Sequence, residues 1–71
     1  METLKLREND DFIKLGQALK KAGLEGSGVE AKNDIQAGLV KVNGEIEERR
    51  GRKLYDGDVF EYNGTQVKIE R

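Results

Sequence analysis

Residues 23–44 read GLEGSGVEAKNDIQAGLVKVNG. This stretch decides the fold, because it contains a helix end, the start of a second helix and a strand that runs into a tight turn. Gly23 is expected to end the first helix, since glycine adopts the left-handed conformation at little cost. The closing dipeptide Asn43-Gly44 is the strongest short signal for a β-hairpin. These residues therefore predict two short helices followed by sheet.

A capping box begins the second predicted helix. Ser27 and Glu30 have the S-x-x-E spacing, in which each side chain accepts a hydrogen bond from the backbone amide of the other residue. The helix is expected to run to about Ala37 and to stop at Gly38. Its buried pair, one turn apart, is expected to be Ala31 and Ile35.

The flanking residues complete an α+β fold. Thr3–Arg7 alternates apolar and polar residues, which predicts a half-buried strand. Asp10 or Asp11 could cap a first helix over Phe12–Ala22, with apolar residues at helical spacing (Phe12, Leu15, Ala18, Leu19 and Ala22). Residues 59–69 repeat the pattern of two strands joined by Asn-Gly. We expect one domain over residues 1–71, with two short helices packed on a small, mainly antiparallel sheet of about five short strands.

Composition excludes several kinds of active site. The chain has 71 residues with no cysteine and no histidine, so thiol nucleophiles, disulfides, most zinc sites and the usual general base near neutral pH are missing. A domain of this size has little room for a large catalytic cleft. No apolar run reaches membrane-spanning length. We therefore expect a cytoplasmic monomer that is not an enzyme and needs no cofactor, metal, membrane or small-molecule substrate.

The charges are unevenly distributed along the chain. The formal net charge is −1, but residues 14–53 contain nine basic and six acidic residues. The segments on either side carry an acidic excess. A locally basic surface is therefore possible on a protein that is acidic as a whole, although a mixed, solvated surface has the same composition.

These motifs resemble the S4-like RNA-binding domain, whose two helices and following strand form the αL motif. The resemblance continues through residues 45–54, EIEERRGRKL, to Gly57-Asp58-Val59, and within the family it points to the small stand-alone bacterial proteins of the YbcJ/YaaA type. It implies that the surface of both helices and the next strand contacts structured RNA, such as ribosomal RNA or a ribosome-assembly intermediate. Many members carry Ser-Arg where this chain has Ser27-Gly28, and leucine where it has Asp34.

The expected RNA-binding residues fall into two groups. Lys14 and Lys21 are nearly two helical turns apart and would project the same way beside Gln17. Lys32 flanks the buried face of the second helix, and Lys41 points outward from its strand. The resemblance implies phosphate contacts for all four of these lysines. The second group is a dense cationic loop, in which guanidinium groups suit phosphates or unpaired bases; it consists of Arg49, Arg50, Arg52 and Lys53.

Other readings of the same residues stay open. Each lysine could be an ordinary solvated side chain, and the loop could be a solubilising turn balanced by Glu47 and Glu48. Tyr55 is the one aromatic residue that is a fair candidate for stacking on a base, since Phe12 and Phe60 are expected in the core. A protein–protein interaction module in a ribonucleoprotein or assembly complex is the alternative function.

Overall fold

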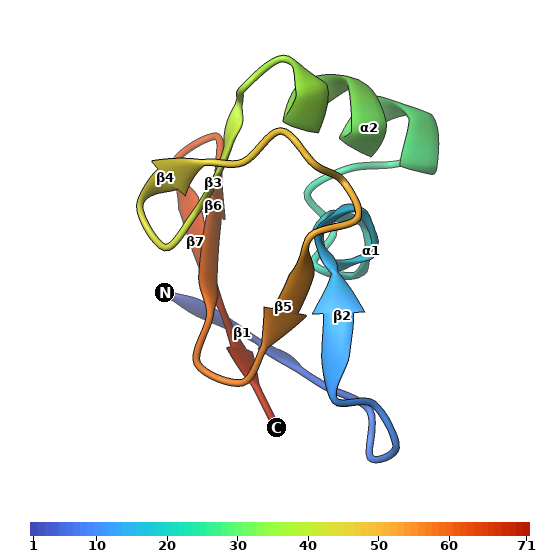
Figure 1. Ribbon diagram of the computed structural model, residues 1–71, viewed down its shortest axis with the longest axis vertical. Coiled ribbons are helices and arrows are strands. Elements are labelled where there is room, and N and C mark those ends of the chain that lie inside the picture. The colour runs from blue at the N-terminus through green and yellow to red at the C-terminus, as the bar shows by residue number, and fades with distance from the viewer.

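The computed structural model describes residues 1–71, which form two helices and seven short strands (Figure 1). The helices are α1 (Leu15–Lys21) and α2 (Gly28–Gln36). The strands are β1 (Glu2–Lys5), β2 (Phe12–Lys14), β3 (Val40–Val42), β4 (Glu45–Ile46), β5 (Lys53–Tyr55), β6 (Val59–Tyr62) and β7 (Thr65–Glu70). No helix is long and apolar enough to cross a membrane. The predicted α+β class is confirmed.

Five of the strands form one mixed sheet in the order β1-β7-β6-β3-β4. Only β1 and β7 pair in parallel, and the other neighbours are antiparallel. Both predicted Asn-Gly turns are present, and Asn43 and Asn63 take the positive φ angles of 51° and 53° that such two-residue hairpins require. Strands β2 and β5 pair separately as a two-stranded antiparallel ribbon.

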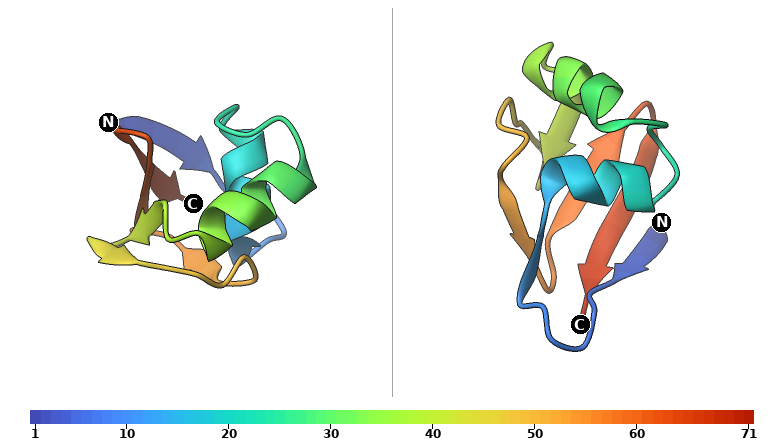
Figure 2. Two further views of the ribbon diagram at one scale, coloured as in Figure 1. Left: turned by 90° about the horizontal axis from the view of Figure 1, so that it is seen from above. Right: turned by 90° about the vertical axis from the view of Figure 1, so that its right-hand side faces the viewer.

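One core lies between the helices and the large sheet. Figure 2 shows α1 and α2 on the same side of this sheet. The side chains that meet there include Leu15 and Leu19 of α1 and Phe60 of β6, none of which is accessible to solvent. The predicted pair Ala31 and Ile35 is also fully buried. Apolar residues recur every three to four positions in the helices and every second position in the strands. Both sets of side chains therefore point into the same core.

The connection between the helices follows the sequence prediction closely. Gly23 has a φ of 76°, and Gly38 after α2 has a φ of 79°. The hydroxyl of Ser27 accepts a hydrogen bond of 3.2 Å from the amide of Glu30. The return bond from the Ser27 amide to the Glu30 carboxylate does not form, so half of the capping box is realised.

The predicted start of the first helix is wrong. Residues 12–14 form strand β2, and α1 begins at Leu15 with no side-chain cap from Asp10 or Asp11. The reason is tertiary, since β2 finds a partner strand in β5, about forty residues later. Phe12 was expected on the apolar stripe of the first helix and in the core, but it lies half-buried on β2 opposite Tyr55 and is not part of the core. The first strand is also shifted, to Glu2–Lys5.

Candidate nucleic-acid interface

The backbone of the cationic loop caps the first helix. The amide of Leu15 donates to the carbonyl of Arg52 at 2.9 Å, and the amide of Gly16 donates to the carbonyl of Arg50 at 3.0 Å. These bonds satisfy two of the amides that every helix leaves unpaired at its N-terminus. They also attach the loop to α1, so the two groups of cations predicted separately become neighbours.

A small open pocket lies where the loop, α1 and the start of α2 meet. It has a volume of about 270 Å³, and three cations but no carboxylate line it. We call it the basic pocket, and its lining residues are Lys14, Gly16, Gln17, Lys20, Gly28, Arg50 and Gly51. A site with several cations and no acid favours a polyanion such as a phosphate backbone.

Lys20 is a member of the basic pocket that the sequence interpretation missed. The helix was expected to start at Phe12, which placed Lys14 and Lys21 along one flank. Because α1 starts at Leu15, Lys14 precedes the helix and shares the pocket with Lys20 of α1, whereas Lys21 does not line it. The sequence did contain a signal for Lys20. It lies four residues after Gly16, so the two residues share one face of the helix.

Lys21 lies beside a second, larger depression. This groove has a volume of about 570 Å³ and runs between α1 and the segment that joins β1 to β2. Its lining residues are Leu6, Arg7, Asp10, Phe12, Ile13, Gln17, Lys20 and Lys21. Gln17 and Lys20 line both depressions, so the groove and the basic pocket are continuous along α1.

The remaining predicted lysines lie on two different faces. Lys32 is exposed on α2, one turn beyond Gly28 on the same side of the helix, and therefore extends the basic pocket. Lys41 is exposed on the outer face of the large sheet, paired in register with Ile46 on one side and Glu61 on the other. That face is directed away from the helices, so Lys41 lies apart from the other predicted RNA-binding residues.

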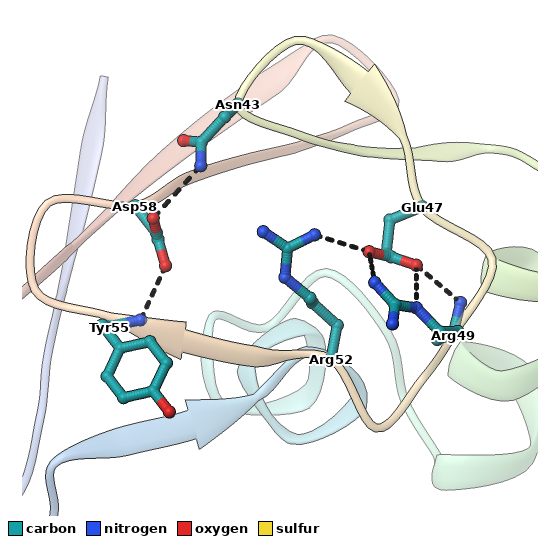
Figure 3. Close-up of polar contacts among 6 residues, drawn as sticks. All are labelled: Asn43, Glu47, Arg49, Arg52, Tyr55 and Asp58. Carbon is teal, nitrogen blue, oxygen red and sulfur yellow. Dashed lines mark hydrogen bonds and ion pairs between the residues drawn. The ribbon is translucent and has the colours of Figure 1, made fainter.

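Two arginines of the loop are bound by one buried carboxylate (Figure 3). Glu47 accepts hydrogen bonds from the side chain of Arg49 at 2.9 and 3.0 Å and from that of Arg52 at 2.7 Å. The hydrogen bonds from Arg49, with one further bond from Arg52, outweigh burial and lower the pKa of Glu47 from 4.5 to about 2. The side chain of Arg49 remains 74% exposed, whereas that of Arg52 is 35% exposed. The side chain of Arg52 is thus mostly enclosed by the protein, whereas the guanidinium of Arg49 remains largely accessible to a partner.

Arg50 and Lys53 form no ion pair. Arg50 lines the basic pocket. Lys53 lies on β5 directly opposite Lys14 on β2, and its Nζ atom is 4.8 Å from the centroid of the Phe12 ring. Among the four cations of the loop, these two are the ones most available to a partner.

An acidic cluster lies on the sheet side of α2. The hydroxyl of Tyr62 donates to the carboxylate of Asp34 at 2.6 Å, and Glu25 is buried beside them. Burial raises the pKa of Glu25, an effect strengthened by Asp34. The hydrogen bond to Asp34 raises the pKa of the Tyr62 hydroxyl. Asp34 is therefore engaged in joining α2 to β6 and does not face the basic pocket.

Comparison with known proteins agrees with this architecture. The model of the S4 domain family matches residues 4–70. A probable ribosome maturation protein, RlbA of Bacillus subtilis, is 50% identical over 54 residues, which are 76% of each chain. The solution structure of YbcJ from E. coli, described as revealing an αL motif involved in RNA binding, matches with a TM-score of 0.73 and 32% identity. That match covers all of this chain and 89% of YbcJ.

Nearly the whole chain is matched by the family model, and the structural match extends over its full length. The chain therefore belongs to the S4 domain family and has the αL arrangement of two helices against a small sheet.

Proposed function

We propose that this protein binds structured RNA, either ribosomal RNA or a ribosome-assembly intermediate, and catalyses no reaction. The observation that carries the proposal is the basic pocket, which Lys14, Lys20 and Arg50 line together with Gly28 at the start of α2, without any carboxylate. Gly28 has no side chain to block approach to that turn. Lys32 and Lys21 extend the cationic surface on the two sides of the pocket.

The shape of this surface favours recognition of the RNA backbone. Lys14 and Lys20 lie on β2 and α1, and the loop that carries Arg50 is hydrogen-bonded to α1, so the backbone positions of these cations are fixed before binding. Phosphate contacts position a nucleic acid without reading its sequence, and double-stranded RNA is recognised mostly through its shape, its phosphates and its 2′-hydroxyl groups. We infer that the protein selects a folded RNA by geometry.

The relatives support the RNA ligand and its link to the ribosome. RlbA is named as a probable ribosome maturation protein, and YbcJ is described as having an RNA-binding motif. A non-catalytic role fits the perturbed groups of this chain, because Glu25, Glu47 and Tyr62 all lie outside the basic pocket, and Glu47 and Tyr62 are hydrogen-bonded to neighbouring side chains.

The test is crosslinking in cells followed by sequencing of the bound RNA. Enrichment of ribosomal RNA, or of its precursors, is expected. Binding of the purified protein to the enriched RNA should weaken as salt rises. The logarithm of the association constant should fall with the logarithm of the salt concentration with a slope of roughly −2 to −3, if about three phosphates are neutralised. A partner captured equally well after ribonuclease treatment, together with salt-independent RNA binding, would overturn the proposal in favour of a protein-interaction module.

A further inference from the structure

The ribbon formed by β2 and β5 presents two aromatic rings and two lysines on one surface. In the antiparallel register, Phe12 lies opposite Tyr55 and Lys14 lies opposite Lys53. Residues directly opposite each other project to the same side of a sheet, and residues two apart on a strand do so as well. These four residues therefore share one side, which we call the ribbon face. The opposite side contributes Leu54 to the core.

The two rings of the ribbon face are in contact but only partly covered. Their centroids are 5.8 Å apart with an interplanar angle of 53°. Such a tilted pair stabilises neighbouring strands, yet Tyr55 remains 48% exposed. Figure 3 shows its ring directed away from Asp58, the residue that binds the Tyr55 amide. A large part of an aromatic surface is thus left to solvent beside two cations.

The ribbon face is continuous with the proposed RNA surface. Lys14 belongs to both the ribbon face and the basic pocket. Phe12 lines the groove beside α1 together with Lys20 and Lys21. A strand that leaves the basic pocket past Lys14 would therefore pass directly over Phe12 and Tyr55.

The carboxylates around the aromatic end of the ribbon are already engaged within the protein. Asp10 pairs with Arg7 at 2.9 Å, and Asp11 pairs with Arg71 at 2.6 Å. Asp56 accepts a bond of 2.9 Å from the amide of Arg71. Asp58 accepts from the amide of Tyr55 at 2.8 Å and from the side chain of Asn43 at 3.1 Å. Hydrogen bonds and ion pairs within the protein thus offset the negative charge at this end.

We propose that the ribbon face binds an unpaired nucleotide next to the structured RNA, with its base stacked on Tyr55 and its phosphate held by Lys14 and Lys53. This inference rests on the proposed RNA-binding function and adds a second subsite to it. Stacking on an aromatic ring accepts any base, because every base has a π-face. The preferred ligand is then a folded RNA with a single-stranded extension, and a blunt hairpin binds less tightly.

The test compares one RNA hairpin in three forms, namely blunt, with a short 5′ extension and with a short 3′ extension. The wild-type protein is expected to bind at least one extended form about five-fold or more tightly than the blunt form. Tyr55→Leu should abolish that gain and leave the affinity for the blunt hairpin nearly unchanged. Tyr55→Phe keeps the ring and serves as the matched control, so it should keep the gain.

A second measurement uses the unchanged protein and needs no variant to fold. With 2-aminopurine in the extension, stacking on Tyr55 should change the fluorescence of the base on binding. Equal affinity for all three hairpins, with unchanged fluorescence, would overturn the ribbon-face subsite while leaving RNA binding by the basic pocket intact. Failure to bind any hairpin would instead overturn the proposed function on which the subsite rests.

Discussion

The Oε1 atom of Glu47 accepts a hydrogen bond of 2.7 Å from Nη1 of Arg52, and the carbonyl of the same arginine accepts from the amide of Leu15 at 2.9 Å. Arg52 therefore connects a buried carboxylate to the first amide of α1. The side chain of Glu47 is 9% exposed. One ion pair thus helps to place the cationic loop against the helix that carries the other cations.

Removing the charge of Glu47 should destabilise the fold. Glu47→Gln leaves the guanidinium of Arg52 without its carboxylate partner and loosens the loop. We expect a loss of roughly 1–3 kcal/mol, below the usual cost of breaking a buried pair because both arginines are partly solvated. Urea unfolding of wild type and variant at neutral pH measures this loss in the free energy of unfolding. Glu48→Gln is the matched control, since Glu48 is exposed and forms no ion pair, and an equal loss in both variants would contradict the role given to Glu47.

Stability should fall on the acid side because of Glu47. Its pKa is about 2 in the folded protein, compared with 4.5 for the unperturbed group. A carboxyl whose folded pKa is lowered contributes stability above its unfolded pKa, and this contribution is lost as pH falls from about 4.5 towards 2. Urea unfolding over this range should show a steep decline in the wild type and a shallower one in Glu47→Gln. Parallel curves would show that another group controls acid unfolding.

Glu25 should have the opposite pH dependence. Its pKa is raised by burial, and Asp34 and Glu30 of α2 raise it further, while the hydrogen bond with Tyr62 of β6 lowers it. The stabilising contribution of its protonated form is complete below the unfolded pKa and is lost as pH rises through the folded pKa.

Glu25→Gln cannot ionise and should therefore gain stability relative to the wild type as pH rises above 4.5. Thermal unfolding of both proteins between acid and neutral pH measures the difference. Glu48→Gln is the control, because it removes one exposed carboxylate and leaves the groups that act on Glu25 unchanged. A pH-independent difference between wild type and Glu25→Gln would contradict the raised pKa.

Reversing two charges in the basic pocket should weaken RNA binding locally. Lys14→Glu with Lys20→Glu is expected to lower affinity for a structured RNA by about ten-fold or more, because both side chains line the pocket. Lys5→Glu with Lys68→Glu changes the net charge equally, but these residues are exposed on the outer face of the sheet. Titration of both double variants with the same structured RNA at fixed salt compares the two losses of affinity. Similar losses would indicate a long-range field and no local site.

Substitutions at two arginines of the loop should affect different properties, RNA binding at Arg50 and thermal stability at Arg52. Arg50→Glu introduces a carboxylate into the basic pocket and should reduce RNA binding with little change in thermal stability. Arg52→Glu places a second carboxylate beside Glu47 and should lower the melting temperature by several degrees. Calorimetry and RNA titration of both variants test the distinction. The roles given to the two residues are wrong if the effects are reversed.

The sequence by itself determined the elements whose signals are local. Both Asn-Gly turns, the glycines that end the helices, and the cap at Ser27 lie where the sequence predicts them. Each depends on backbone contacts within about four residues, so neighbouring residues suffice to specify it. The alternating pattern likewise places Val40 and Val42 inward and Lys41 outward. The α+β class and the family follow from these signals.

Only the tertiary structure decided what residues 12–14 become and which cations meet. Phe12 fits a helical apolar pattern, but pairing with Tyr55 makes it part of a strand. Lys20 and Arg50 are thirty residues apart in sequence and share a pocket, because the carbonyls of the loop cap α1. Pairing between distant strands and capping by a distant backbone leave no periodic signal in the chain, so the charge pattern predicted basic residues without predicting their grouping.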